Sequence, residues 1–272
     1  MHRINTTRWF WAFCCIHLII WTAVPALTRG SVDFDTLESI AWGNQWQWGY
    51  SKHPPLAAWL SAIFTHILPG MNWPIYFAAQ VMIIMMFWAV WRLAHQFLTE
   101  VPALIAVILL EGVLFVSLNS TGMNPNQVMI PLWALLALCF YHALTKNRWR
   151  DWLLVGVFAG LNVLAKYEAP LLFVSMLAVM LLTQPGRKAF TNAKLYVAAL
   201  VGGLVIAPHI IWSIRHGFSE VHYALVSSDQ DQGIWQHFAS PWRFFIDMLG
   251  TVIGSVVMSM PFWRRWKTTP HS

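Results

Sequence analysis

Eight strongly apolar stretches alternate with short polar segments along the 272 residues of the chain. A helix needs about 20 mostly apolar residues to cross the hydrocarbon core of a membrane. The apolar stretches cover residues 9–28, 73–91, 101–118, 128–145, 152–166, 169–183, 195–213 and 243–262. The pattern therefore predicts about eight membrane-spanning helices. Two of them, at 152–166 and 169–183, are short enough to be tilted, broken or partly re-entrant.

The first polar segment, residues 29–72, is the longest interruption of this pattern. It contains "GSVDFDTLESIAWGNQWQWGYSKHPPLAAWL" (30–60) and then the apolar run "LAAWLSAIFTHIL" (56–68). This run is too short to span comfortably, and Pro54-Pro55 before it suits the start of a helix. We expect a helix that lies in the membrane interface after a polar loop.

Composition agrees with the pattern of apolar stretches. Hydrophobic residues make up 58% of the chain and charged residues 10%, against about 45–50% and about 25% in soluble proteins. An ordinary soluble domain is excluded, and the sequence predicts an all-α polytopic membrane protein that forms a single transmembrane domain over 1–272. Residues 1–28 are interpreted as a first helix that stays uncleaved.

The distribution of charge predicts the orientation in the membrane. If the N-terminus is cytoplasmic, 12 of the 17 Lys and Arg fall on the cytoplasmic side, as the positive-inside rule expects. These are Arg3, Arg8, Arg92, Lys146, Arg148, Arg150, Arg187, Lys188, Lys194, Arg264, Arg265 and Lys267. Eight of the eleven acids fall outside: Asp33, Asp35, Glu38, Glu168, Glu220, Asp229, Asp231 and Asp247. The net charge of +6 is thus a topology signal, and no nucleic-acid partner is expected.

Three acids stand in the first external loop, at Asp33, Asp35 and Glu38. A carboxylate at the mouth of a membrane protein can act as general base on a hydroxyl. The alternative is a solvated loop acid or a helix N-cap at Asp35, with Glu38 at the capping-box spacing. From the residues alone, both interpretations stay open.

Cations gather on the same predicted face. Lys52 and His53 precede the proline pair, where Lys52 could bind a lipid phosphate or simply reach the headgroups. Lys166 and Glu168 bracket Tyr167 at an external helix end, and they could pair with each other or face an anion.

Two further features complete the set of candidates. Arg215 and His216 follow the seventh apolar stretch and offer either a second phosphate contact or an ordinary interfacial cap. Glu111 lies in the middle of an apolar stretch, so its side chain must be neutral, paired or facing an internal cavity. The single histidines of the apolar stretches form no metal-binding motif.

Three motifs in order resemble the bacterial branch of the dolichyl-phosphate-mannose protein mannosyltransferase family. Asp35 precedes "YSKHPPL" (50–56), which resembles the family's Tyr-x-x-His-Pro-Pro-Leu motif. "GLNVLAKYEAPLL" (160–172) resembles its lysine-tyrosine segment, and "APHIIWSIRHGFSEVHYAL" (207–225) resembles its Pro-x-x-x-Trp-x-x-x-His-Gly segment. The resemblance covers about residues 30–225.

This resemblance implies a GT-C fold and a membrane glycosyltransferase. The enzyme would move a sugar from a polyprenyl-phosphate donor to a lipid A, glycan or protein acceptor on the external face of the inner membrane, with inversion. Asp35 would be the general base. Donor phosphate contacts would come from Lys52, His53, Lys166 and Arg215, with supporting roles for Asp33, Glu38, Tyr50, Tyr167, Glu168 and His216.

The chain departs from the family pattern in three respects. One is Glu168, which follows the lysine-tyrosine pair where the family more often has a small polar residue. The usual Asp-Glu pair is Asp35-Thr36 here, which leaves a divalent metal as an open question and no other cofactor implied. Family members are usually longer. The chain could therefore be a truncated reading frame, a minimal form or half of a split enzyme. The competing hypotheses are a protein that only binds or transports lipid-linked sugars, and a structural partner subunit.

Overall fold

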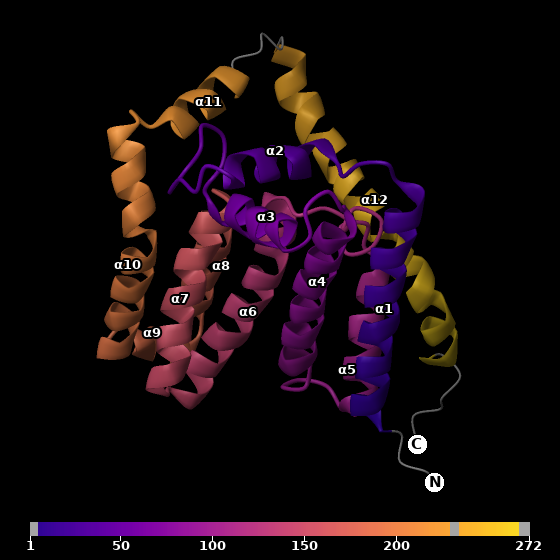
Figure 1. The fold of residues 1–272 in the computed structure, drawn as a ribbon. Coiled ribbons are helices and arrows are strands. Elements are labelled where there is room, and N and C mark those ends of the chain that lie inside the picture. Colours follow the sequence, from indigo (N-terminus) through magenta and orange to yellow (C-terminus); the bar gives the residue numbers. More distant parts are fainter. Residues whose placement is uncertain (1–4, 229–233, 267–272) are drawn as a thin grey trace.

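The computed structural model describes residues 5–228 and 234–266, and the regular elements of this part of the chain are all helices (Figure 1). They are α1 (Thr6–Thr28), α2 (Phe34–Gly43), α3 (Leu56–Ile67), α4 (Trp73–Ala94), α5 (Glu100–Leu109), η1 (Leu110–Gly112, a 3-10 helix), α6 (Pro125–Lys146), α7 (Trp149–Ala165), α8 (Ala169–Leu182), α9 (Gln184–Ala189), α10 (Ala193–Arg215), α11 (Ser219–Ser228) and α12 (Ile234–Trp266). The predicted all-α class is confirmed.

Five helices are long and apolar enough to cross a membrane. They are α1, α4, α6, α10 and the Ala239–Met260 part of α12, and each coincides with a predicted span. The predicted spans at 101–118, 152–166 and 169–183 correspond to the shorter helices α5, α7 and α8. A membrane crossing by these three, and therefore the number eight, stays a prediction.

The apolar stretch 101–118 is not a single helix, because the chain leaves the α-helical path after Leu109. The α5 helix ends at Leu109, and the chain then turns through η1. One oxygen of the Glu111 carboxylate accepts a hydrogen bond from the indole of Trp21 (2.6 Å), and the other lies 2.8 Å from Nδ1 of His17. Both partners belong to α1, so the acid that sequence analysis left without a partner joins two helices.

His17 continues this cluster toward α4. Gln80 donates from its amide nitrogen to the carbonyl of Ser120 (3.0 Å), so its oxygen faces Nε2 of His17 at 2.9 Å. Nε2 must therefore carry a hydrogen. His17 thus links Glu111 to Gln80, so polar groups of α1, η1 and α4 satisfy one another inside the apolar bundle.

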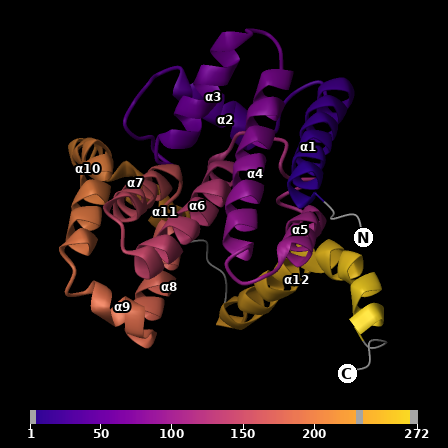
Figure 2. The same cartoon turned by 90° about the horizontal axis from the view of Figure 1, so that it is seen from below.

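The helices form a bundle with one covered end. Figure 2 shows α4 and α6 in the middle, with α1 and α5 on one side and α7 and α10 on the other. The α2 and α3 helices lie across one end of the bundle, and α11 lies at that same end (Figure 1). The helix predicted over 56–68 forms as α3, over Leu56–Ile67, while its location in a membrane interface stays a prediction.

The predicted sidedness separates two ends of the bundle. The loop that holds α2 and α3 lies at one end, whereas the α6–α7 connection and α9, which carry Lys146, Arg148 and Lys188, lie at the opposite end (Figure 1). Arg3, Asp229, Asp231 and Lys267 of the charge distribution lie outside the described residues. Which end faces the cytoplasm stays a prediction.

Candidate active site

A buried tyrosine shapes the loop between α2 and α3. Tyr50 exposes 3% of its surface and stacks on Trp42, with ring centroids 5.3 Å apart. Its hydroxyl accepts a hydrogen bond from the backbone of Gln47 (3.3 Å), and its own N–H donates to the carbonyl of His53 (3.1 Å). Burial raises the pKa of Tyr50, so the phenol keeps its proton at neutral pH. Tyr50 therefore supports the turn that presents Lys52 and His53.

The acids of the first loop divide into a cap and a free carboxylate. Asp33 is the N-cap of α2 and accepts hydrogen bonds from the backbone N–H (3.0 Å) and the hydroxyl (2.7 Å) of Thr36. A side chain at Gly122 would collide with this carboxylate, so glycine lets the loop before α6 lie against it. Asp35 is exposed in the first helical turn. The alternative that made Asp35 the cap and Glu38 its capping-box partner is wrong, because Asp33 occupies the cap position.

Glu38 instead holds Lys52. The ammonium of Lys52 lies 3.0 Å from Oε2 of Glu38, and the two side chains are 24% and 22% exposed. Burial acts to lower the pKa of Lys52, but the hydrogen bond and charge of Glu38 outweigh it, with smaller contributions from Tyr223 and Asp35. The pKa of Lys52 therefore lies above its ordinary value, and the side chain stays protonated at neutral pH.

His53 lies among these charges. Burial lowers the pKa of its imidazole, and the positive charge of Lys52 lowers it further. Lys166 acts in the same direction, whereas Glu38 and Asp35 act against it. His53 is therefore neutral at neutral pH, and it can donate or accept one hydrogen bond without adding charge.

Lys166 reaches the same region from the end of α7. Its ammonium donates to Oδ1 of Asn126 (2.7 Å) and lies 2.7 Å from Oε1 of Glu168. Asn126 is held in the first turn of α6, because the side chain of Asn124 accepts from the N–H groups of Asn126 and Gln127. The start of α6 thus fixes the direction of the Lys166 side chain.

His209, for which the sequence predicts no role, connects α10 to the loop before the first motif and to the lysine-tyrosine segment. Its Nδ1 lies 2.7 Å from the carbonyl of Trp48, and its Nε2 lies 3.0 Å from the hydroxyl of Tyr167. A carbonyl can only accept, so Nδ1 carries a hydrogen, while Nε2 shares a hydrogen bond with the hydroxyl of Tyr167. A lone histidine in an apolar run gives no local signal. Only its position next to Pro208, within the third motif, could have drawn notice.

The structure does not join Arg215 to the lysines. Arg215 ends α10, is exposed, and forms no salt bridge or side-chain hydrogen bond within the described part of the chain. The ring of His216 stacks on Trp212 at 4.2 Å and hydrogen-bonds the Trp212 carbonyl (2.8 Å). The two residues stay candidates on the adjoining edge of the site. Glu220, buried beyond them, accepts a hydrogen bond from Ser213.

The site therefore consists of one exposed carboxylate beside two fixed cations and a neutral imidazole. Asp35 comes from α2, Lys52 and His53 from the following loop, and Lys166 from the end of α7. This arrangement can take a proton from a hydroxyl and stabilise negative charge on a phosphate. Among the described residues, no group of three or more His, Cys, Asp or Glu side chains could hold a metal ion.

Comparison with known proteins gives the family. Residues 52–212, more than half of the chain, match the family described as dolichyl-phosphate-mannose-protein mannosyltransferase. The chain belongs to this family. The matched region begins at Lys52 and ends at Trp212, so it contains His53, Lys166 and His209 of the candidate site.

This mannosyltransferase-family chain is also similar to two named proteins, one in sequence and one in fold. The chain is 26% identical over 262 residues to the lipid A galacturonosyltransferase RgtD of Rhizobium johnstonii, covering 90% of this chain and 51% of that protein. It thus spans about half the length of this curated relative. The structure of the S. cerevisiae protein O-mannosyltransferase Pmt1-Pmt2 complex bound to the sugar donor covers 81% of this chain and 35% of its own, with a TM-score of 0.52 and 16% identity. This likeness concerns the fold and agrees with the predicted GT-C-like architecture.

Proposed function

We propose that this chain carries the donor site and general base of a membrane glycosyltransferase that uses a polyprenyl-phosphate-linked sugar. The observation that carries the proposal is the meeting of Asp35, Lys52, His53 and Lys166, which come from separate segments, at one end of the bundle. The family match and the likeness to two sugar transferases support it.

Asp35 acts as the base in this proposal. It removes the proton from an acceptor hydroxyl, and the oxygen attacks the anomeric carbon of the donor sugar from the face opposite the phosphate. The bond between that carbon and the phosphate oxygen breaks, so the configuration inverts and the proton stays on Asp35. The exposed side chain of Asp35, without a hydrogen-bond partner among the described residues, is open to an incoming acceptor.

The lysines stabilise the leaving group. The departing polyprenyl phosphate gains negative charge as the sugar bond breaks, and Lys52 and Lys166 are placed to meet that charge. Glu38 and Glu168 hold the two ammonium groups in the free protein. A bound phosphate competes with these carboxylates, and His53 adds a neutral hydrogen bond.

The remaining parts of the proposal concern location and acceptor. The site lies on the external face of the inner membrane, with the N-terminus in the cytoplasm, in agreement with the positive-inside charge distribution. The acceptor is lipid A, another glycan or a protein. The names of the two relatives, one acting on lipid A and one on protein, support this range.

Glu111, the acid in the middle of a predicted span, does not support the hypothesis of a transporter. A transport path needs ionisable groups open to a cavity at membrane depth. Both oxygens of the Glu111 carboxylate are engaged, by His17 and by Trp21, so this group is part of the helix packing.

Transfer of radiolabelled sugar from a panel of polyprenyl-phosphate donors tests the proposal. We expect membranes with this chain to show transfer that Asp35→Asn lowers by about 10²–10⁴-fold, since a general base contributes about that factor. Asp247→Asn removes a carboxylate of α12, outside the candidate site, and is the control. Normal transfer by Asp35→Asn would exclude Asp35 as the base. No transfer from any donor by the folded wild type would leave a protein that only binds lipid-linked sugars.

A further inference from the structure

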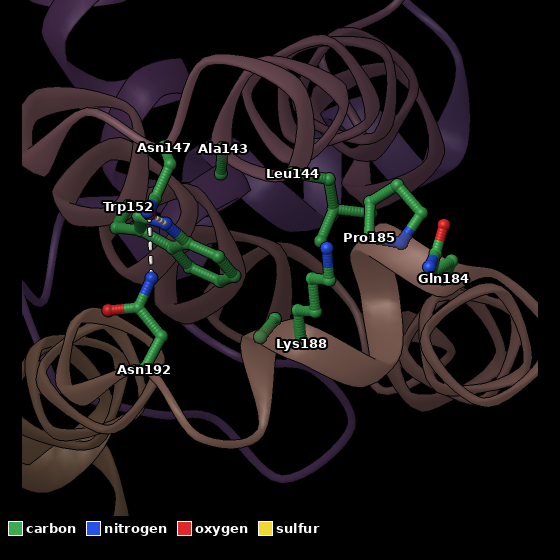
Figure 3. A pocket seen from close by; sticks show the side chains of 9 residues that line it. Ala143, Leu144, Asn147, Trp152, Gln184, Pro185, Lys188 and Asn192 are labelled. Atoms are coloured by element: carbon green, nitrogen blue, oxygen red, sulfur yellow. Dashed lines mark hydrogen bonds between the residues drawn. The ribbon is translucent and has the colours of Figure 1, made fainter.

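A cavity of about 240 Å³ lies between the ends of α6, α7 and α9 (Figure 3). These helix ends lie at the end of the bundle opposite the candidate active site (Figure 1). Asn147, which follows α6 in a left-handed conformation, forms part of its wall. Its Oδ1 accepts hydrogen bonds from the indole of Trp152 (3.1 Å) and from the amide of Asn192 (2.6 Å). Trp152 is 1% exposed, so this wall is preformed and rigid.

One cation lines the cavity without a partner. The Lys188 side chain extends from α9 toward Leu144 (Figure 3), and it forms no salt bridge or side-chain hydrogen bond with any described residue. Lys194 approaches from the side and donates to the carbonyl of Asn147 (2.5 Å). Asp151, the nearby acid in the first turn of α7, does not line the cavity. The cavity is therefore electropositive and polar on one side.

The end of α8, which leads into α9 through Thr183, presents a surface that suits lipid tails. Leu181 and Leu182, its last two residues, expose 54% and 80% of their surface. On a membrane helix such leucines face acyl chains. The cavity is smaller than the roughly 300–1,000 Å³ of sites for drug-sized ligands, so it suits a headgroup better than a whole soluble cofactor.

We propose that this cavity binds a phosphate group carried by an anionic membrane phospholipid. The phosphate lies against Lys188 beside the Asn147–Asn192 wall, and the acyl chains follow the exposed leucines of α8. Basic pockets between membrane helices bind anionic headgroups by the same combination of charge and shape. The site is separate from the candidate active site and does not depend on the proposed transferase activity.

Native mass spectrometry of the detergent-solubilised full chain tests this site. The probes are phosphatidylglycerol, zwitterionic phosphatidylethanolamine, and two soluble phosphates, glycerol 3-phosphate and inorganic phosphate. We expect retained phosphatidylglycerol in the wild type and an apparent affinity about five-fold lower in Lys188→Gln. Lys188→Arg should retain binding. Arg150→Gln, an exposed cation at the same end but outside the cavity, should leave binding unchanged.

Three results would overturn the proposal. Equal retention of the anionic and zwitterionic lipids would remove the role of charge. An equal loss of affinity for phosphatidylglycerol in Lys188→Gln and Arg150→Gln would mean that the overall positive charge of this end, and not the cavity, attracts the lipid. Displacement of the lipid by glycerol 3-phosphate or inorganic phosphate at equal concentration would identify a site for soluble phosphate.

Discussion

His209 is the residue whose removal most directly tests how the site is assembled. It joins α10 to the loop before Lys52, through Trp48, and to the segment after α7, through Tyr167. The residue is 3% exposed, so both hydrogen bonds are shielded from water. We expect His209→Ala to loosen these two segments while the rest of the bundle stays folded.

The magnitude follows from the two hydrogen bonds. Each contributes about 1 kcal/mol net, and a buried group left without a partner costs about 1–3 kcal/mol. The variant therefore loses about 2–4 kcal/mol of local stability. At about 1.4 kcal/mol per factor of ten, the opening equilibrium of residues 44–53 rises by about 30-fold to several hundred-fold. The α7–α10 contact persists, because it forms where Gly156 and Gly160 let the two backbones approach.

Hydrogen–deuterium exchange measured by mass spectrometry reports this opening directly. Peptides covering 44–53 and 166–168 should exchange faster in His209→Ala, whereas peptides of α4 and α6 should not change. Tyr167→Phe removes one of the two hydrogen bonds and should give a smaller effect, about one factor of ten. His216→Ala is the control, since within the described part of the chain the hydrogen bond and stacking of the His216 ring are both with Trp212, four residues before it.

Unchanged exchange of residues 44–53 in His209→Ala would refute a role of His209 in holding this segment. A uniform rise that includes α4 and α6 would also refute it, because His209 would then serve general packing and not the assembly of this site.

Two further predictions concern the same end of the molecule. Burial and Lys52 lower the pKa of His53, so the unfolded chain takes up this proton at higher pH than the folded chain. The stability that His53 contributes is therefore complete above about pH 6.5 and is lost as the pH falls toward the lowered pKa. Thermal unfolding between about pH 7.5 and 5.5 should show a steeper decline in wild type than in His53→Asn, and parallel curves would contradict this. Gly122→Ala should lower the free energy of unfolding by about 1–3 kcal/mol, because the new methyl collides with Asp33 and Thr36. Gly30 has open space around it, so Gly30→Ala should change the free energy of unfolding by less than about 0.5 kcal/mol. Equal destabilisation by the two substitutions would contradict the collision at Gly122.

Several parts of the site followed from local sequence. The Pro54-Pro55 pair predicted the start of α3, which the structure places at Leu56. The motif that contains Lys52 and His53 indicated one wall of the site, and the lysine-tyrosine segment indicated the other. These features depend on neighbours in the chain, so a sequence contains them without any knowledge of packing.

Other parts required packing between distant residues. His17 and Glu111 are 94 positions apart, and Trp48 and His209 are 161 apart. Neither pair has a spacing that a motif can express. Arg215 is the opposite case. The family resemblance predicted that it binds the donor phosphate together with the lysines, but among the described residues it makes no contact with them.

The sequence by itself thus determined the helical membrane class, the long polar loop and the residue types available for chemistry, because hydrophobic length and proline geometry act locally. The tertiary structure alone decided that Asp33 caps α2 while Asp35 stays free, that Glu38 holds Lys52, and that the stretch 101–118 breaks after Leu109. The physical reason is that a buried polar group must find a partner, and which partner it finds depends on how the helices pack.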